Sequence, residues 1–334
     1  MKYANRETVR ASMSTWVRLV LKIAISAGLL AWVVRSLDLS SIADRLKTAD
    51  PLAVAVALAI TLAIATLHAA RWHIVVSANN ARLSYAMAIQ LTLIGYFFNQ
   101  TLPSTVGGDA FRIWGAYRAG LRIADAANSV ILDRFVALAA LLLMVTVTIP
   151  WLFEFVGTGP ARWAIVALVV AGSAGFAALL SVDRLPASLL RWRPLQLIGT
   201  LSAYGRRVLL APQHSVPTVI LTVLAHCVAA ATMYVLAIAI DVNVSLFHCM
   251  LLFPLVMIVS ILPVSIAGWG VREGAMVVAL GLVGVAPAAA FSLSVLYGLV
   301  NMAAGIPGGL LWLARARTSR RDLPRDPGTL KSWR

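Results

Sequence analysis

The sequence has little charge. Only 12% of its 334 residues are charged and 60% are hydrophobic, whereas a soluble domain carries about 25% charged residues. The apolar residues form blocks close to the roughly 20 residues that a membrane-spanning helix needs. The short alternating segments of a β-barrel are absent, and no segment outside the blocks is long enough for a separate soluble domain. We therefore predict an all-α polytopic membrane protein.

Cysteine and recognisable catalytic motifs are also scarce. Cys227 and Cys249 lie in or beside apolar segments, so neither a disulfide framework nor a metal-ligand spacing is present. The five histidines form no H-E-x-x-H motif, and G-x-S-x-G is missing. We expect no metal and no cofactor, and we disfavour an intramembrane hydrolase or transferase.

Acidic residues are outnumbered by basic ones, 13 against 28, which gives a net charge of +15. Such a charge could indicate a nucleic-acid partner. Here the basic residues lie in the connections between apolar blocks, where they orient the protein and contact anionic lipid. We expect anionic lipids at the cytoplasmic face as partners, and no nucleic acid.

About six blocks have the length of full spans, and two shorter blocks do not. The full spans are predicted at residues 16–36, 52–75, 126–150, 162–181, 216–240 and 288–314. The shorter blocks, 86–103 and 247–263, end abruptly in sequence rich in proline and glycine. The first span has no convincing cleavage site, and we expect it to be retained rather than removed as a signal peptide.

Charge placement decides whether the short blocks cross the membrane. If both crossed, the basic loop 184–207 would lie outside, against the positive-inside rule. If both re-enter and return, the clusters at 71–82, 112–122 and 184–207 lie in the cytoplasm with both termini. We therefore predict two re-entrant segments of opposite orientation in the bacterial inner membrane. The loop after residue 184 mixes leucine, tryptophan and arginine, and we expect it to lie on the inner surface, partly as an amphipathic helix.

Two similar motifs occur at these breaks. The stretch LPSTVGGDAFR from Leu102 and the stretch LPVSIAGWGVR from Leu262 have like residues at five positions, four of them identical, each pair 160 residues apart. Three full spans separate the motifs, as expected for inverted repeats around a substrate site. We thus predict one transmembrane domain over 1–315, with repeats centred near 86–125 and 247–286. A basic cytoplasmic tail covers 316–334.

The motif residues suit a phosphate-sized anion. Glycines let backbone N–H groups approach a ligand, and a proline frees backbone groups of a broken helix. Helices starting near Asp109 and Glu273 would offer unpaired N–H donors, and Arg112 and Arg272 would supply a fork for phosphate. We expect the two arginines to bind the same anionic group from opposite sides. The alternative is that these are packing turns whose arginines pair with Asp109, Asp133 or Glu273.

Three stretches of the chain resemble a known family. They are FFNQTLPSTVGGDAFRIWGAYRAG, VILDRFVAL and LPVSIAGWGVREGAMVVALGLVGV. They are similar to the flippase-like membrane domain of lysylphosphatidylglycerol synthases and to stand-alone relatives of the UPF0104 type. The resemblance covers roughly residues 15–315. It implies movement of a phospholipid between leaflets. In the multidomain synthases the lipid that moves is an aminoacylated phospholipid, which a separate soluble domain makes. We expect no such domain in this chain, and therefore neither lysyl transfer nor lysylphosphatidylglycerol as cargo.

The resemblance also assigns candidate site residues. Those that match the family's motifs in the first half are Asn99, Pro103, Gly107, Gly108, Asp109 and Arg112, and those in the second half are Gly268, Gly270, Arg272 and Glu273. Asp133 and Arg134 match an acidic-basic pair in the following helix and are assigned to ion coupling or ion pairing. We add Ser104, Thr105 and Ser265 as substrate-binding candidates, although bonding to freed backbone also explains them.

These observations predict a non-enzymatic lipid transporter. It would move an anionic or glycosylated lipid by alternating access, passively or with an ion gradient, because no nucleotide-binding motif is present. Asp109, Asp133 and Glu273 are candidate couplers. The alternative is an accessory protein that presents a lipid to a partner synthase or glycosyltransferase, and self-association stays open. Gly305 and Gly309 predict close helix packing in the last span.

Overall fold

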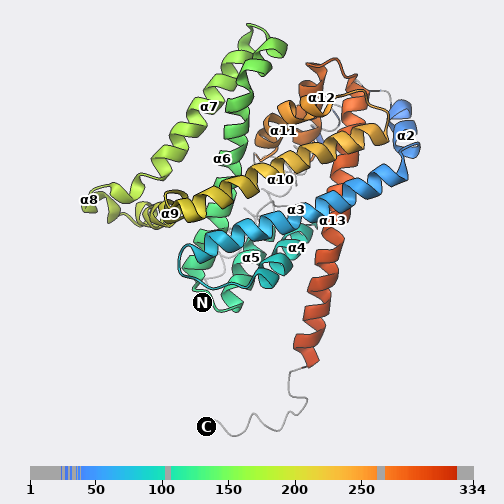
Figure 1. Cartoon of the computed structure of the whole chain (residues 1–334). Helices are drawn as coiled ribbons and strands as arrows, with labels where there is room; N and C mark the ends of the chain where they lie inside the picture. The colour runs from blue at the N-terminus through green and yellow to red at the C-terminus, as the bar shows by residue number, and fades with distance from the viewer. Residues whose placement is uncertain are drawn as a thin grey trace, which may run out of the picture.

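A computed structural model describes residues 39–101, 107–261 and 268–321, with six single positions between residues 24 and 37. All regular structure in these described parts is helical (Figure 1). The first half holds α2 (Leu39–Lys47), α3 (Pro51–Ser77), α4 (Tyr85–Thr101), α5 (Gly107–Arg118) and α6 (Ile123–Val156). The middle holds α7 (Pro160–Leu179), the short 3₁₀ helix η1 (Val182–Arg184), α8 (Ala187–Leu190) and α9 (Arg193–Leu209). The last part holds α10 (Pro212–Ala239), α11 (Leu246–Ser260), α12 (Val271–Gly281) and α13 (Pro287–Arg321).

Local sequence explains where several helices begin. Asp50 caps α3, because its side chain accepts a hydrogen bond of 2.9 Å from the Leu52 N–H, and Pro51 follows in the first turn. Ser245 caps α11 in the same way through the His248 N–H, at 3.1 Å. The helix α6 ends at Gly157, whose φ of 67° lies in the left-handed region that favours glycine.

Within the described residues, five helices are long and apolar enough to cross a membrane: α3, α6, α7, α10 and α13 up to Arg315. They coincide with five of the six predicted full spans. The first predicted span, 16–36, falls largely outside the described residues. The chain is thus an all-α polytopic membrane protein, as the sequence predicted.

The two shorter predicted blocks also form helices that stop early. The helix α4 has 17 residues and α11 has 15, and each is followed by a second short helix, α5 or α12. The residues that join the members of each pair, 102–106 and 262–267, lie outside the described part. Each block is thus followed by a second short helix, and Pro103 and Pro263, which were expected to break the two segments, lie outside the described residues.

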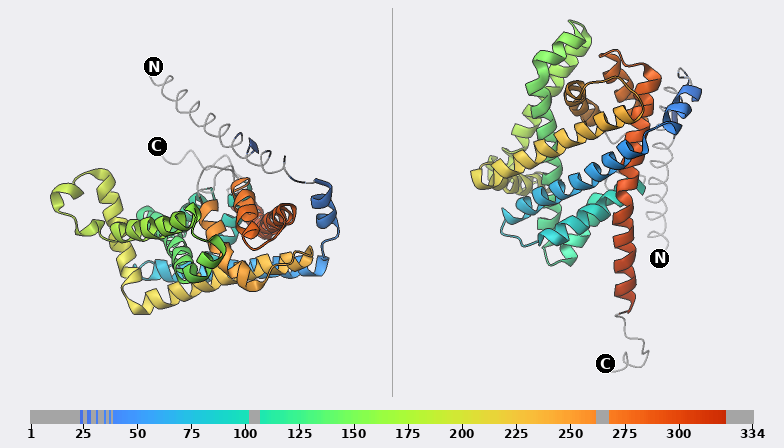
Figure 2. Two further views of the ribbon diagram at one scale, coloured as in Figure 1. Left: turned by 90° about the horizontal axis from the view of Figure 1, so that it is seen from above. Right: turned by 45° about the vertical axis from the view of Figure 1, so that its right-hand side comes forward.

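The helices α3 and α10 pack side by side along much of their length (Figures 1 and 2). They run in opposite directions, because the Asp50 N–H, just before α3, donates to the Ala239 carbonyl at the end of α10, at 2.8 Å. Around this pair, α4 packs on α13 and α11 packs on α6. In α13, Gly305 and Gly309 lie against Phe97 of α4, which confirms the predicted close helix packing.

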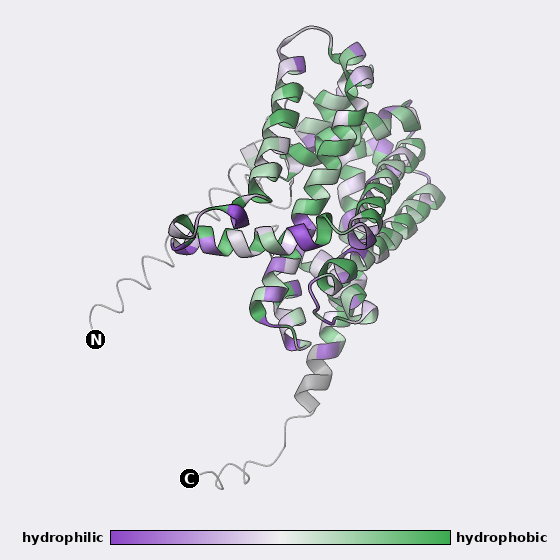
Figure 3. Cartoon of the chain, turned by 60° about the vertical axis from the view of Figure 1, so that its left-hand side comes forward, coloured by the Kyte–Doolittle hydropathy of each residue, from purple (hydrophilic) through white to green (hydrophobic). Residues whose placement is uncertain are grey.

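The turns that carry basic residues lie at one end of the molecule. Leu83 and Leu121, from the α3–α4 and α5–α6 turns, share one apolar cluster. The end of α3, the end of α7 and α9 share the neighbouring one. Arg315, near the end of α13, bonds to Gln90 of α4. Figure 3 shows the hydrophobic colour on the long helices and hydrophilic residues near their ends.

Acidic residues mark the opposite end. There Asp50 meets the end of α10, and Arg45 of α2 donates to the Ile240 carbonyl at 3.2 Å. The rings of Phe155 and His248, 5.4 Å apart, join the end of α6 to the start of α11. Each short helix pair thus begins and ends at one end of the molecule, α4–α5 at the basic end and α11–α12 at the other.

The loop predicted to be amphipathic forms α8 and α9. In α9, Leu201, Tyr204 and Val208 are buried against α3 and α6, and burial raises the pKa of Tyr204. The side chain of Asp183 accepts from Ser202 at 2.9 Å and pairs with Arg206 at 3.5 Å, which fastens η1 to α9. The predicted helical character of this loop is confirmed.

Candidate functional site

The first broken segment folds back on itself through a close backbone contact. The Asn99 side chain, in the last turn of α4, accepts a hydrogen bond of 3.0 Å from the Gly108 N–H at the start of α5. A Cβ at Gly108 would overlap the Gly95 carbonyl and the Asn99 amide. Glycine is therefore required at position 108 for α5 to return against α4.

Arg112 of α5 lies inside the protein beside two other helices. Its Nη2 donates to Asp133 Oδ2 of α6 at 2.9 Å. Arg71 of α3 donates from Nε to the other oxygen of the same carboxylate, at 2.7 Å. The three side chains are buried. Asp133 is thus shared by two arginines from different helices, which places three charges at membrane depth.

Aromatic and small residues fix the position of Arg112. Its guanidinium carbon lies 4.2 Å from the centre of the Trp72 ring, a cation–π distance. Trp72 in turn donates to Ser129 of α6 at 3.1 Å. The stem of Arg112 passes over Gly95, where a Cβ would lie 3.2 Å from its Cδ. These contacts leave the Arg112 side chain little freedom.

Asp109 extends the cluster toward solvent. Arg134 donates from Nε and Nη2 to its two oxygens, at 2.8 and 2.9 Å, and Arg112 Nη1 lies 3.6 Å from the same carboxylate. Asp133 and Arg134, assigned by the resemblance as a pair, do not bond to each other. Neighbours on a helix point about 100° apart, so each reaches a different partner.

The second motif makes a smaller cluster. Arg272 Nη2 donates to Glu273 Oε1 at 2.5 Å, and Glu273 Oε2 accepts from the Gly270 N–H at 2.5 Å. Ser294 of α13 also bonds to both side chains, at 3.3 Å. The Arg272 guanidinium lies 4.8 Å from the Trp269 ring centre. Gly268 and Gly270 have φ of 81° and 88°, which favours glycine at both positions.

The structure brings most candidate residues into these two clusters. Asn99, Gly107, Gly108, Asp109 and Arg112 gather at the first break with Asp133 and Arg134, and Gly268, Gly270, Arg272 and Glu273 gather at the second. Pro103, Ser104, Thr105 and Ser265 lie outside the described residues. Both arginines pair with carboxylates, which is the arrangement that the alternative interpretation expected. Anion binding by these residues stays a prediction.

Arg71 and Trp72 were not among the predicted site residues. The sequence predicts Arg71 in a cytoplasmic cluster of basic residues with Arg82. In the structure its side chain is buried and pairs with Asp133. A signal was present, because Arg71 falls inside a predicted span, where a charge is costly and usually functional. Beside it, His68 of α3 and Tyr96 of α4 share a hydrogen bond that the sequence did not indicate.

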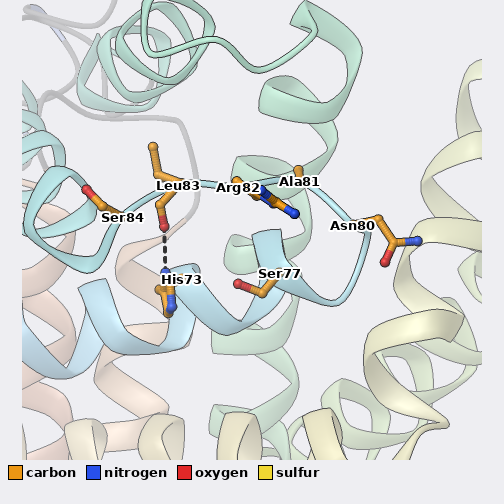
Figure 4. Close-up of a pocket in the computed structure, with 7 residues that line it drawn as sticks. All are labelled: His73, Ser77, Asn80, Ala81, Arg82, Leu83 and Ser84. Carbon is orange, nitrogen blue, oxygen red and sulfur yellow. Dashed lines mark hydrogen bonds between the residues drawn. The ribbon is translucent and has the colours of Figure 1, made fainter.

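A separate cavity of about 580 Å³ lies at the turn between α3 and α4 (Figure 4). His73 and Ser77 of α3 line it together with residues 80–84 of the turn, and His73 Nδ1 donates to the Leu83 carbonyl at 2.7 Å across it. Arg82 is its only charged lining residue apart from the titratable His73. None of the predicted site residues lines this cavity.

Sequence comparison gives one family match. The model of a family described as the lysylphosphatidylglycerol synthase TM region matches residues 19–309. The match includes both broken segments and every residue of the two charge clusters. No curated protein matches the chain.

Proposed function

The chain belongs to the lysylphosphatidylglycerol synthase TM-region family, and from this premise we propose that it moves an anionic or glycosylated lipid between the leaflets of the inner membrane. Membership makes it a membrane protein of lipid metabolism or transport. The proposed movement of lipid between leaflets rests on the geometry of the two broken segments.

The observation that carries the proposal is the charged cluster of Arg71, Arg112 and Asp133 at the first helix break. Ionisable side chains at membrane depth are expensive, and they commonly mark a substrate or ion pathway. Irregular backbone at this depth is tolerated only inside protein or beside a water-filled cavity. A broken helix next to buried arginines fits the binding of a polar headgroup while the acyl chains stay in lipid.

The helix order supports the inverted repeat. Exchanging α3–α6 for α10–α13, in order, leaves the pattern of packed helices unchanged. The pair α4 on α13 becomes α11 on α6, α3 on α4 becomes α10 on α11, and α3 stays on α10. The two copies run in opposite directions and their short pairs begin at opposite ends. Transporters with such repeats alternate access around the repeat interface.

The segregation of charge supports the orientation. Arg82, Arg122 and Arg207 all lie at the basic end, which the positive-inside rule assigns to the cytoplasm. The pair α4–α5 would then enter from the cytoplasmic side and α11–α12 from outside. Two of the charges counted in the cytoplasmic clusters, Arg71 and Arg112, are instead buried, but the remaining arginines keep the same bias.

Reconstitution of the purified chain alone tests the proposal. A protein that only presents lipid to a partner enzyme would move none in liposomes, whereas a transporter would. A pH gradient across the same liposomes tests coupling, because Asp109→Asn would remove the gradient dependence if Asp109 carries the proton. Lipid movement that is no faster than in protein-free liposomes would refute translocation.

A further inference from the structure

We propose that Arg71 and Arg112 together form a site for a phosphate group that carries a single negative charge, and that Arg71 sets this preference. The inference rests on the proposed function and names the chemistry of its substrate. A lipid phosphodiester and free dihydrogen phosphate share this chemistry.

The first cluster has more positive than negative charge. Contacts of 3.6 Å or less connect three arginines, Arg71, Arg112 and Arg134, to two carboxylates, Asp109 and Asp133, which leaves one positive charge in excess. Arg71 is 4% exposed, Arg112 6% and Asp133 1%. An uncompensated charge in such surroundings is unfavourable, and an anion would neutralise it.

Two guanidinium nitrogens in the cluster have no acceptor. Arg71 Nη1 and Arg112 Nε are buried, and neither has a hydrogen-bond partner among the described residues. Arg71 uses Nε for Asp133, and Arg112 uses Nη2. Buried donors are nearly always satisfied, so these two are available for the oxygens of a ligand. The charge excess and the unused donors are independent observations, and both point to an anion.

The second cluster lacks both features. Arg272 is balanced by Glu273 alone, so the pair is neutral. Its Nε and Nη2 are both bonded, and its nitrogens are absent from the buried unpaired donors of the described chain. Glu273 is also held by the Gly270 N–H. The two halves are therefore unequal, and the excess charge that attracts an anion belongs to the first half.

The size of the excess selects the ligand's charge. A phosphodiester carries one negative charge, which would make the cluster neutral. A phosphomonoester carries about −1.5 to −2 at pH 7, which would leave a buried negative excess. The planar guanidinium fork fits phosphate oxygens, which a lysine ammonium cannot reproduce. We expect the site to prefer diester over monoester headgroups.

Ligand-induced thermal stabilisation of the purified protein in an uncharged detergent tests the site. The probes are dioctanoyl phosphatidylglycerol, dioctanoyl phosphatidic acid, dioctanoylglycerol and inorganic phosphate. We expect apparent affinity for the diester to exceed that for the monoester by about tenfold, and no saturable effect of dioctanoylglycerol. A response to inorganic phosphate assigns the site to the phosphate group itself, and a response to the diester lipid alone assigns it to a headgroup. Equal responses to the diester and to dioctanoylglycerol overturn the inference.

Variants separate ligand binding from folding. Arg71→Gln removes the excess charge while Asp133 keeps Arg112, so the ligand-free melting temperature should be maintained while diester affinity falls at least tenfold. Arg122→Gln is the matched control, because it removes one positive charge from an exposed side chain and should leave binding unchanged. If Arg71→Gln does not fold, the preference of the wild-type protein for diester over monoester is by itself the test of the site. If Arg71→Gln moves lipid as fast as wild type, this inference is refuted but translocation is not. Diester binding without lipid movement refutes translocation but not this site.

Discussion

Asp133 is the residue on which the first cluster depends, because it is the shared acceptor of Arg71 and Arg112. Asp133→Asn would leave two buried guanidinium groups without their carboxylate. Removing one partner of a buried ion pair costs about 3–5 kcal/mol. We expect the variant to unfold at a markedly lower temperature than wild type in detergent.

Asp125 provides the control for this experiment. It pairs with Arg122, whose side chain is 84% exposed, and exposed ion pairs contribute about 0–1 kcal/mol. Asp125→Asn should therefore unfold close to wild type. Equal melting temperatures for the two variants would mean that Asp133 does not hold the cluster together.

For single residues, the sequence indicated which charged side chains gather in the two clusters better than how they pair. Asp109, Arg112 and Glu273 stood out because charges are rare in apolar sequence. Their partners could not be predicted, because Arg71 and Asp133 are 62 positions apart and meet only when α3 packs on α6. For the same reason, the sequence did not show that the first cluster holds one more arginine than carboxylates.

Among the elements, the contact between α4 and α13 depends on glycine. A Cβ at Gly308 would overlap the Leu93 carbonyl and backbone, which cannot move without shifting α4. We expect Gly308→Ala to destabilise the protein by about 1–3 kcal/mol, the usual range for overpacking. Gly175→Ala in α7 is the control, because its Cβ would meet open space and alanine favours helix by about 1 kcal/mol. If the two substitutions lower the melting temperature equally, the close contact at Gly308 is contradicted.

The helix α9 has an apolar stripe that continues beyond the core. Leu201 and Val208 of this stripe are buried, whereas Leu197, one turn earlier on the same side, is 71% exposed. Arg191 and Arg193 lie just before the exposed part, at the start of the helix. Such a helix end fits the surface of an anionic bilayer, with leucine in the lipid and arginine at the headgroups.

Single cysteines on α9 test this placement after Cys227 and Cys249 are replaced. A fluorophore at Leu197→Cys should be quenched by brominated acyl chains. A fluorophore at the neighbouring exposed position Gln196→Cys, which points about 100° away from Leu197 and off the apolar stripe, should be quenched by aqueous iodide. Iodide quenching of equal strength at both positions would place α9 in water.

The sequence also predicted the elements better than their arrangement. The lengths of the apolar blocks located five spans and the two shorter helices α4 and α11. It could not predict that α4 packs on α13 and α11 on α6, because those contacts join residues 90 or more positions apart. The contact between α4 and α13 also depends on small residues such as Gly305 and Gly308.

For the whole molecule, the charged ends predict one orientation. Arg118 and Arg207 are exposed at the basic end, and Thr158 is exposed in the turn after α6 at the other. In a cysteine-free background, an impermeant thiol reagent added to intact cells should label Thr158→Cys but neither Arg118→Cys nor Arg207→Cys. Labelling of the two arginine positions from outside would exclude the re-entrant arrangement.

We propose that the chain moves lipid and recognises a phosphate group at Arg112. The most direct measurement is the movement of a fluorescent phosphatidylglycerol between leaflets of liposomes that contain the purified protein, followed by a leaflet-impermeant quencher. A fluorescent neutral lipid runs in parallel. We predict that wild type accelerates the anionic lipid over protein-free liposomes, and that Arg112→Lys, which keeps the charge but loses the planar fork, slows the anionic lipid about tenfold or more while the neutral lipid is unaffected. Equal slowing of both lipids in Arg112→Lys, or no acceleration by wild type, would contradict the account.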